Sequence, residues 1–431
     1  MILRLSDSFS RALVVAAALL MGLWLSFFGI RSAIAQHYSE GDTEKQLESA
    51  VHWEPSNPAY WYLLGRFEQY NLEQPDTPLA EESYKKAIAL HPHSTDAWLE
   101  LGLAYELDGK GEDAREAYLQ AKKSYPTSAD VSWRYGNFLL RQGKQSDAYA
   151  ELRRAIEADP RRAATIFSRA YRANPNIDEI LAQLLPANQS VYLEVVNEAS
   201  AEKQLSVAKT VWSRLLTLHP GSAILNVDAF LSALLQDGEY AEARRVWDQQ
   251  VATMNLPPLL QPQGSVVWDP SFESGVFGPA FSWMFEPIVQ GVIISVDKAE
   301  KRSGSQSLRL SFDGKHNPNL EAACTLAVVE PRTAYRFTGW VKTKDLTTMH
   351  GVGFRIHSYG SAEAPVVNTN QIYGNNPFTL IEQPWTAGPD IHRVKICVTR
   401  EPSDDPSVRI SGTAWVDDVN LTPQPAEHHK P

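Results

Sequence analysis

Residues 95–128 read TDAWLELGLAYELDGKGEDAREAYLQAKKSYPTS, and the next 34 residues repeat their pattern. The recurring positions carry small residues, large apolar residues and a proline. They are Trp98, Leu101, Gly102, Tyr105, Ala114, Tyr118, Ala121 and Pro126 in one copy, Gly136, Leu139, Ala148, Leu152, Ala155 and Pro160 in the next, and Trp61, Leu64, Gly65, Ala80, Tyr84, Ala87 and Pro92 in an earlier copy with three extra residues. Self-similarity at a fixed period of about 20–50 residues indicates a solenoid of stacked units.

These skeletons resemble the tetratricopeptide repeat, a pair of antiparallel helices that stacks on its neighbours. The small residues Gly102 and Ala114 let the two helices of a pair approach. Pro126 ends the second helix, because proline has no N–H group and clashes with the preceding turn. The resemblance implies a scaffold that binds peptides or proteins and performs no chemistry of its own.

We expect the array to cover residues 40–255, regular over 58–160 and degenerate afterwards. Beyond Pro160 the pattern continues in partial copies: Ala163, Phe167, Ala170 and Pro175; Tyr192, Ala208, Trp212, Leu215 and Pro220; and Phe230, Leu234, Ala243 and Trp247.

The resemblance also implies a binding groove lined by the first helix of each pair. The matching positions are Tyr62, Arg66 and Gln69, then Leu99, Leu103 and Glu106, then Trp133, Asn137 and Leu140. Trp133 replaces a residue that is usually small or polar, so we expect it to contact a partner. The groove lacks the lysine and asparagine cluster with which chaperone-binding relatives hold a C-terminal carboxylate.

The N-terminus carries the apolar run ALVVAAALLMGLWLSFFGI at residues 12–30, preceded by a short cytoplasmic segment, 1–11. As a helix rising 1.5 Å per residue, the run is about 28 Å long, close to the bilayer core. We expect one transmembrane anchor that leaves the bulk of the chain extracytoplasmic or periplasmic. The alternative is a signal peptide cleaved near Ala35, because Ala33-Ile34-Ala35 has the small-residue pattern of a cleavage site.

Composition excludes one class of function. The formal net charge is −11, so the chain has no surplus of basic residues with which to neutralise phosphates. We therefore expect no nucleic-acid partner. Acid/base catalysis by paired carboxylates is also not expected, because Asp404-Asp405 and Asp417-Asp418 lie in a predicted turn and at a strand end.

A proline-rich linker at 256–264 separates the helical pattern from short alternating stretches typical of a β sandwich. Examples are the segments 292–296, 307–312 and 335–341. We expect a jelly-roll sandwich over residues 265–423 and a polar tail over 424–431. The fold class is therefore multidomain: an all-α solenoid followed by an all-β sandwich, with one N-terminal transmembrane helix.

The segments Asp269-Pro270-Ser271-Phe272-Glu273-Ser274-Gly275 and Trp415-Val416-Asp417-Asp418-Val419-Asn420-Leu421 resemble carbohydrate-binding modules of the galactose-binding-like type. The resemblance implies a structural calcium ion bound by Glu273 and Asp417, although no cofactor is required. It also implies a glycan site, for which the outward positions of the strand near residue 355 and the loop beside it are candidates: Arg355, His357, Tyr359, Tyr373, Asn375 and Asn376. Trp340, Trp385 and Trp415 are expected in the core.

The chain has two cysteines, Cys324 and Cys397. Alternation places Cys397 on the face opposite Val394, Ile396 and Val398. It places Cys324 on the face of Leu326 and Val328, so the two thiols are expected on opposite sides of a sheet unless a β-bulge shifts one strand. Whether they pair is left open.

Together these features favour a membrane-anchored scaffold that binds proteins through the groove and glycan through the sandwich, in surface polysaccharide assembly or export. A purely protein-binding scaffold with a structural sandwich is the alternative. A carbohydrate-active enzyme is the least favoured.

Overall fold

The computed structural model describes residues 8–219, 226–258, 264–275, 280–286, 288–359, 366–403, 405 and 408–425. The chain divides into two compact units, Met1–Ala187 and Asn188–Pro431. This division lies inside the predicted array, whereas the sequence places the change of fold at 256–264. Each unit is described by itself below.

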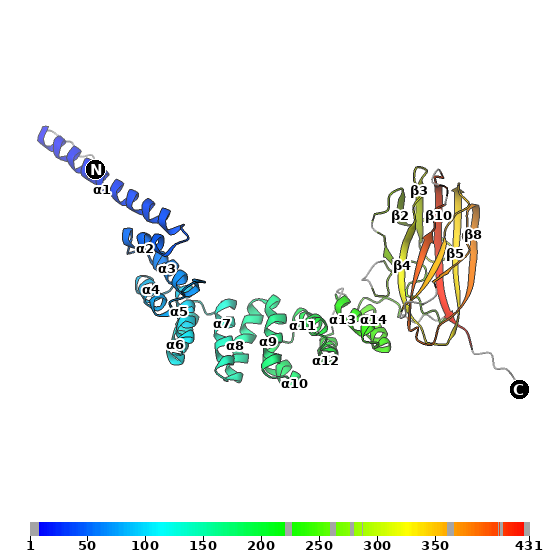
Figure 1. The fold of residues 1–431 in the computed structure, drawn as a ribbon, viewed down its shortest axis with the longest axis horizontal. Coiled ribbons are helices and arrows are strands. Elements are labelled where there is room, and N and C mark those ends of the chain that lie inside the picture. Colours follow the sequence, from blue (N-terminus) through cyan, green and yellow to red (C-terminus); the bar gives the residue numbers. More distant parts are fainter. Residues whose placement is uncertain are drawn as a thin grey trace. The chain divides into compact units, whose positions relative to one another are not determined.

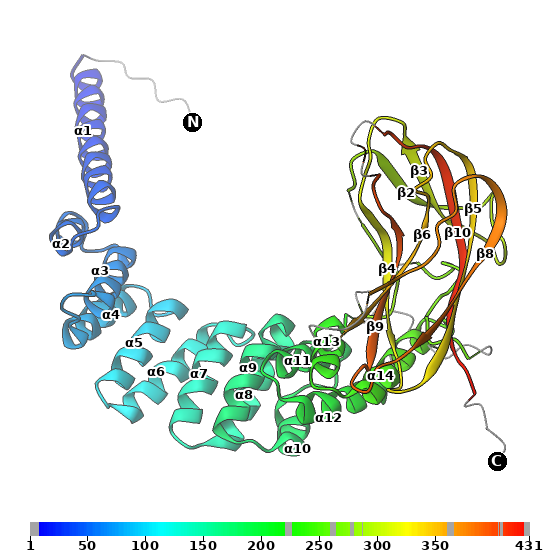
Figure 2. The ribbon, with the colours of Figure 1, turned by 45° about the vertical axis from the view of Figure 1, so that its right-hand side comes forward.

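The first unit is entirely helical (Figures 1 and 2). Its elements are α1 (Ser8–Ser39), α2 (Glu44–Trp53), α3 (Pro58–Tyr70), α4 (Thr77–Leu90), α5 (Thr95–Leu107), α6 (Gly111–Ser124), α7 (Ala129–Arg141), α8 (Gln145–Ala158), the 3-10 turn η1 (Pro160–Arg162), α9 (Ala163–Ala173), α10 (Ile177–Glu179) and the π-helical turn η2 (Ile180–Leu184). Serine side chains start two of the helices: Ser94 accepts a hydrogen bond from the Ala97 amide and Ser128 from the Val131 amide. By length and composition, residues 11–39 of α1 suffice to cross a membrane.

Close approach within three pairs, α3–α4, α5–α6 and α7–α8, depends on a glycine of the first helix. A Cβ atom added to Gly136 would lie 2.7 Å from Cγ of Leu152, and one added to Gly65 would lie 2.7 Å from the Tyr84 ring. Tyr84 and Leu152 are fully buried. The glycine position of the repeat is therefore filled by the large residue of the partner helix.

Ion pairs join successive pairs of helices at about one repeat of separation. Lys110 Nζ lies 2.9 Å from Glu81 Oε1 of the preceding pair, and Lys122 Nζ lies 2.5 Å from Glu151 Oε1 of the following pair. Glu81 and Glu151 are almost fully buried, so each of these carboxylates requires a cationic partner. The contacts fix the register between neighbouring repeats.

The second unit begins with α11 (Gln189–Ala201), α12 (Leu205–Leu216), α13 (Asp228–Gln236) and α14 (Tyr240–Thr253). The weak repeat positions of the sequence are buried between these helices: Tyr192, Ala208, Trp212, Leu215, Phe230, Leu234, Ala243 and Trp247. Pro220 lies outside the described residues.

Among the residues that the structure describes, ten strands follow: β1 (Met284–Phe285), β2 (Val292–Asp297), β3 (Ser307–Asp313), β4 (Leu320–Val328), β5 (Ala334–Leu346), β6 (Gly353–Tyr359), β7 (Val366–Asn368), β8 (Gly374–Thr386), β9 (Arg393–Arg400) and β10 (Ser411–Pro423). They form two five-stranded antiparallel sheets, in the orders β1-β4-β9-β6-β7 and β2-β3-β10-β5-β8. The predicted class, helical repeats followed by a β sandwich, is confirmed.

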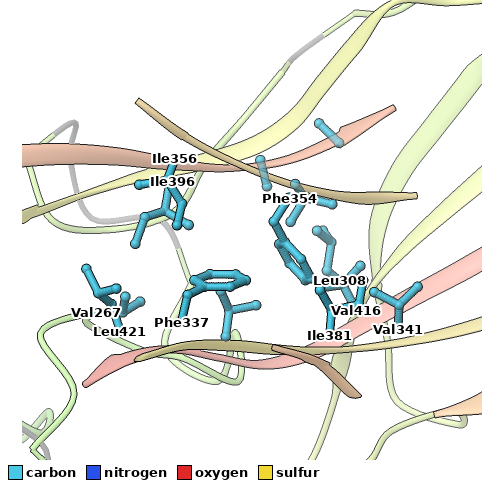
Figure 3. Close-up of a cluster of buried hydrophobic side chains, with 14 of the residues drawn as sticks. Val267, Leu308, Phe337, Val341, Phe354, Ile356, Ile381, Ile396, Val416 and Leu421 are labelled. Carbon is cyan, nitrogen blue, oxygen red and sulfur yellow. The ribbon is translucent and has the colours of Figure 1, made fainter. Parts of the chain in front are cut away.

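The core between the two sheets is apolar, and Figure 3 shows side chains from both sheets meeting there. Phe337 of β5 and Phe354 of β6 meet edge to face, with ring centroids 5.0 Å apart. Position 339 of β5 is a glycine because a Cβ atom there would come within 2.4 Å of the Phe354 ring.

The helix α14 packs directly on the sandwich. The fully buried Trp247 meets Trp268 at 5.1 Å and Phe281 at 5.4 Å between ring centroids. Nearby, Arg244 donates a hydrogen bond to the Val328 carbonyl, and the Tyr240 ring stacks on His392. The last helix of the array is therefore part of the same folded unit as the strands.

The structure corrects the expectation that the thiols lie on opposite faces, because Cys324 and Cys397 form a disulfide. They are directly opposite each other in the β4–β9 register, which is shifted between Glu321 and Ala323. The alternation of Cys324 with Leu326 is as predicted, but Ala323 and Ala327 point into the core and Leu326 does not. Both cysteines therefore lie on the outer face.

Replacing Gly136 by alanine tests the close approach of α7 and α8. The added methyl group must displace Leu152, and overpacking of this kind costs about 1–3 kcal/mol. We expect a lower thermal midpoint of the helical circular dichroism signal in detergent-solubilised full-length protein. Gly111→Ala is the matched control, because only one atom, 3.8 Å away, lies near its Cβ position. An equal midpoint for both variants contradicts the packing argument.

The disulfide closes a loop with a sequence separation of 73 residues. In the chain-entropy model, its loss from a loop of this size costs about 4 kcal/mol. We expect the variant with Cys324→Ala and Cys397→Ala to unfold at a lower urea concentration, measured by fluorescence of the full-length chain. An unchanged midpoint, with wild-type thiols that react with maleimide before reduction, excludes the bond.

Candidate functional site

The nine predicted groove residues lie on α3, α5 and α7, and they differ in accessibility. Gln69, Leu99 and Asn137 are buried; Tyr62, Leu103, Glu106, Trp133 and Leu140 are half-buried; and Arg66 is exposed. The accessible part of the predicted groove therefore consists of Arg66 and the five half-buried side chains.

An arginine and two tyrosines form one end of this surface. The Arg66 guanidinium carbon lies 5.9 Å from the ring centroids of both Tyr62 and Tyr70. Tyr70, which the sequence analysis missed, donates a hydrogen bond of 2.7 Å to Glu100. Burial and the negative charge of Glu100 raise the pKa of Tyr70. The phenol is therefore a fixed hydrogen-bond donor.

Trp133 lies at the other end and is partly covered. Arg169 of α9 lies over its indole at 4.8 Å from the ring centroid, and the Arg169 Nη1 group donates to Asn137 Oδ1 at 3.3 Å. Asn137 in turn donates to the Trp133 carbonyl at 2.7 Å. The ring is held in one orientation, as a pre-organised contact would require.

The charges between these two ends are paired across helices. Arg134 lies 2.9 Å from Glu100, and Arg141 donates to Glu106 at 2.8 Å. These pairs join α5 to α7 at separations of 34 and 35 residues. This spacing equals one repeat. Acidic and basic residues one repeat apart in the sequence could therefore have predicted these ion pairs.

On the sandwich, the structure brings Arg355 and His357 together on the outer face of the first sheet, around Glu321. His357 Nε2 lies 2.8 Å from Glu321 Oε1, and Lys395 Nζ lies 2.7 Å from Glu321 Oε2. Partial burial acts to raise the pKa of Glu321, but hydrogen bonds from Lys395 and His357 outweigh it and lower this pKa to about 2. The Glu321 carboxylate stays charged and paired at neutral pH.

Arg355 also forms an ion pair with Glu401 at 2.6 Å and a hydrogen bond with Asn368 at 2.8 Å. The other glycan candidates lie apart from this network or outside the described side chains. Tyr359 ends β6, and its side chain lies outside the described residues. Tyr373 is exposed just before β8, and two residues of β8 form hydrogen bonds near β5: Asn375 accepts from the Asp345 amide and Asn376 donates to Thr343.

A cleft of about 830 Å³ lies over β5 and β10 of the second sheet. Its wall includes half-buried Trp340, with the Arg302 guanidinium 4.0 Å from the ring centroid. Asp418 has a positive φ of 51° at a register shift of β10. It accepts hydrogen bonds from Ser271 at 2.6 Å and Ser303 at 2.7 Å and pairs with Arg302. Asn420 and Thr422 complete the polar side of the cleft.

Trp340 therefore differs from the core position that the sequence predicts. Its strand neighbours Gly339 and Val341 are buried, whereas Trp340 takes the outer face. Trp385 belongs to the core between the sheets, as predicted. Trp415 is only 6% exposed but is not part of that core: its strand neighbours Ala414 and Val416 point inward, whereas the Trp415 indole donates a hydrogen bond to Asp297 on the outer face.

The acids expected to hold calcium are used by the chain itself. Asp417 Oδ2 accepts hydrogen bonds from the Arg302 and Ser303 amides at 2.7 and 3.1 Å, and Glu273 Oε1 accepts from the Ser305 amide at 2.9 Å. Burial raises the pKa of Asp417 to about 6, although these amides act to lower it. These carboxylates are therefore already hydrogen-bonded to backbone amides, and a calcium ion held by Glu273 and Asp417 stays a prediction.

Comparison with known proteins supports the helical part. Residues 70–129 and 109–163 match the family model of the tetratricopeptide repeat. The type IV pilus assembly protein PilF of Pseudomonas aeruginosa is 27% identical over 186 residues. That match covers 43% of this chain and 62% of PilF, so the chain spans less than two thirds of this relative.

Two solved structures of different kinds are similar to parts of the chain. YrrB, described as a TPR protein with an unusual peptide-binding site, is 13% identical and matches 49% of this chain and 94% of its own, with a TM-score of 0.26. The CBM22-1 xylan-binding domain of Paenibacillus barcinonensis Xyn10C is 14% identical over 36% of this chain and 92% of its own, with a TM-score of 0.25. Scores this low carry no argument about function. Residues 70–163 thus match the tetratricopeptide repeat model within a longer helical array, and an antiparallel β sandwich follows the helices.

Proposed function

We propose that the protein is a membrane-anchored extracytoplasmic scaffold, and that it binds a protein partner through the surface formed by α3, α5 and α7. The observation that carries this proposal is the arrangement of aromatic rings with arginines on that surface. Tyr62, Tyr70 and Trp133 are each held beside an arginine. Aromatic residues and arginine are the side chains that most often dominate binding energy at interfaces.

The partner is a peptide or helix with apolar side chains. Glu100 and Glu106 are already paired with arginines, so the surface offers little unpaired charge to a strongly charged ligand. Leu103 and Leu140 are half-buried between the two aromatic ends and offer apolar contact.

The sandwich is the glycan-binding part of this proposal, in surface polysaccharide assembly or export. Its support is the cleft at Trp340, whose lining combines this aromatic ring with the polar side chains of Asn420, Thr422 and Asp418. Sugar sites combine an apolar ring with a few directed hydrogen-bonding groups. The face at Arg355 and His357, the position expected from the sequence, is the second candidate.

A purely protein-binding scaffold is the alternative, and one observation favours it. The Arg355 and His357 side chains are engaged in ion pairs with Glu401 and Glu321, which a glycan would have to break. The sandwich then serves as a structural cap. The similarity to a pilus assembly protein is compatible with either form of scaffold. Binding, not catalysis, is the activity proposed in both cases.

A photo-crosslinking amino acid at position 66 or 103 of the full-length protein in cells tests the groove. We expect discrete adducts from these positions and none from position 125, where the exposed Tyr125 follows α6. Trp133→Ala should strongly reduce the adducts, because loss of an aromatic hot-spot contact costs about 2 kcal/mol or more. Adducts that persist in Trp133→Ala but disappear in Tyr125→Ala would place the partner elsewhere.

Glycan arrays with detergent-solubilised full-length protein test the sandwich. Trp340→Ala should weaken binding by about 2 kcal/mol, roughly 30-fold, if the ring stacks on sugar. Leu380→Ala is the matched control, since Leu380 is the cross-strand neighbour of Trp340 and 40% exposed. A loss confined to His357→Ala assigns the site to the first sheet. No binding by the wild type to any glycan selects the protein-binding alternative.

A further inference from the structure

The anchor helix and the repeat array are continuous. The helix α1 runs without interruption from Ser8 to Ser39, nine residues past the apolar run that ends at Ile30. Ala35, on the last turns, is fully buried in a cluster with Leu47, Ala50 and Leu64. The end of α1 therefore forms, with α2, the first helical hairpin of the array.

This hairpin brings the C-terminal end of α2 back to the end of the apolar run. The Arg31 side chain donates a hydrogen bond to the Trp53 carbonyl, and Ser32 Oγ donates to Glu54 Oε2 at 3.3 Å. The opposite end of α2 carries Asp42 and Glu44. The tip of the hairpin is therefore acidic, whereas its base combines these polar contacts with apolar residues such as Ile30 and Ile34.

The base carries an apolar hollow of about 520 Å³, lined by Ile30, Ala33, Ile34, His37, Tyr38 and Trp53. Ile30 is 63% exposed and Trp53 is 38% exposed. The hollow is continuous with the exposed apolar surface of α1. We call it the juxtamembrane hollow.

The depth of the hollow follows from helix geometry. If residues 12–30 cross a bilayer core about 30 Å thick, Arg31 lies at the edge of the hydrocarbon and Trp53 lies at the same level. Tryptophan, tyrosine and arginine are the residues that settle in this interfacial layer. A water-exposed position for the hollow would leave Ile30 and Ile34 in contact with solvent.

We propose that the juxtamembrane hollow seats a phospholipid of the bilayer that α1 spans, and that α1 is retained and not cleaved near Ala35. Cleavage after Ala35 would remove a fully buried residue of the first hairpin and expose Leu47 and Ala50. The proposal rests on the anchoring part of the proposed function. It fixes the first repeat in the headgroup layer, with no flexible tether between membrane and array.

Two measurements on the full-length protein test it. The first is intact-mass analysis of protein purified from membranes, which should show residues 1–35 still present. The second uses nitroxide labels at Trp53→Cys and at Leu90→Cys, in nanodiscs of phosphatidylcholine. The native cysteines are joined to each other, so a label introduced without reduction reports the new position. Leu90 on α4 is 44% exposed and serves as the matched control.

We expect the label at position 53 to collide with oxygen and to lose collisions with a water-soluble nickel complex, and the label at 90 to show the reverse. His37→Cys, at an exposed wall of the hollow, gives the same readout if Trp53→Cys does not fold.

An N-terminus at Gln36 overturns both the inference and the proposed anchor. A full-length, membrane-bound protein whose labels at 53 and 90 are equally accessible to nickel overturns the inference alone. In that case the proposed scaffold function stands.

Discussion

The structure depends on one constraint: a pair of repeat helices cannot bury its own apolar face, so each pair needs a neighbour and the ends need caps. Within the array, Gly65 and Gly136 allow the approach that closes each pair. In the first unit the hairpin formed by the last turns of α1 and by α2 covers α3, with Ala35 and Leu47 buried beside Leu64. In the second unit Trp247 of α14 is covered by Trp268 and Phe281 of the sandwich. The first helices are thus covered by the end of the proposed membrane anchor, and the last helix is covered by the β sandwich.

Periodicity predicted the helical pairs well because packing inside a repeat is local. Gly136 and Leu152 are 16 positions apart, and their contact follows from the pattern alone. The orientation of Cys324 could not be obtained this way. Alternation shows that Cys324 and Leu326 share a face, but not which face points into the core. That depends on packing between segments far apart in the sequence, as when Arg244 of α14 reaches the Val328 carbonyl.

The candidate sites show the same division. The sequence predicts which helices carry Trp133 and Arg66. It does not predict that Arg169 and Tyr70 contact them and orient their side chains. For the sandwich, strand alternation brought Arg355 and His357 to one face, as the structure has them. Glu321, which neutralises that face, lies at the register shift in β4, where alternation no longer predicts the direction of a side chain. Trp340 was assigned to the core although Gly339 and Val341 alternate with it.

If the sandwich is extracytoplasmic, as proposed, the disulfide between β4 and β9 distinguishes exported molecules from molecules retained in the cytosol. Thiols stay reduced in the cytosol and pair in oxidising compartments outside it. A molecule whose C-terminal sandwich has crossed the membrane carries Cys324 and Cys397 joined, and one that has stalled on the cytoplasmic side carries two free thiols. The bond is therefore a built-in marker of topology, which a thiol reagent can read in intact cells without any added tag.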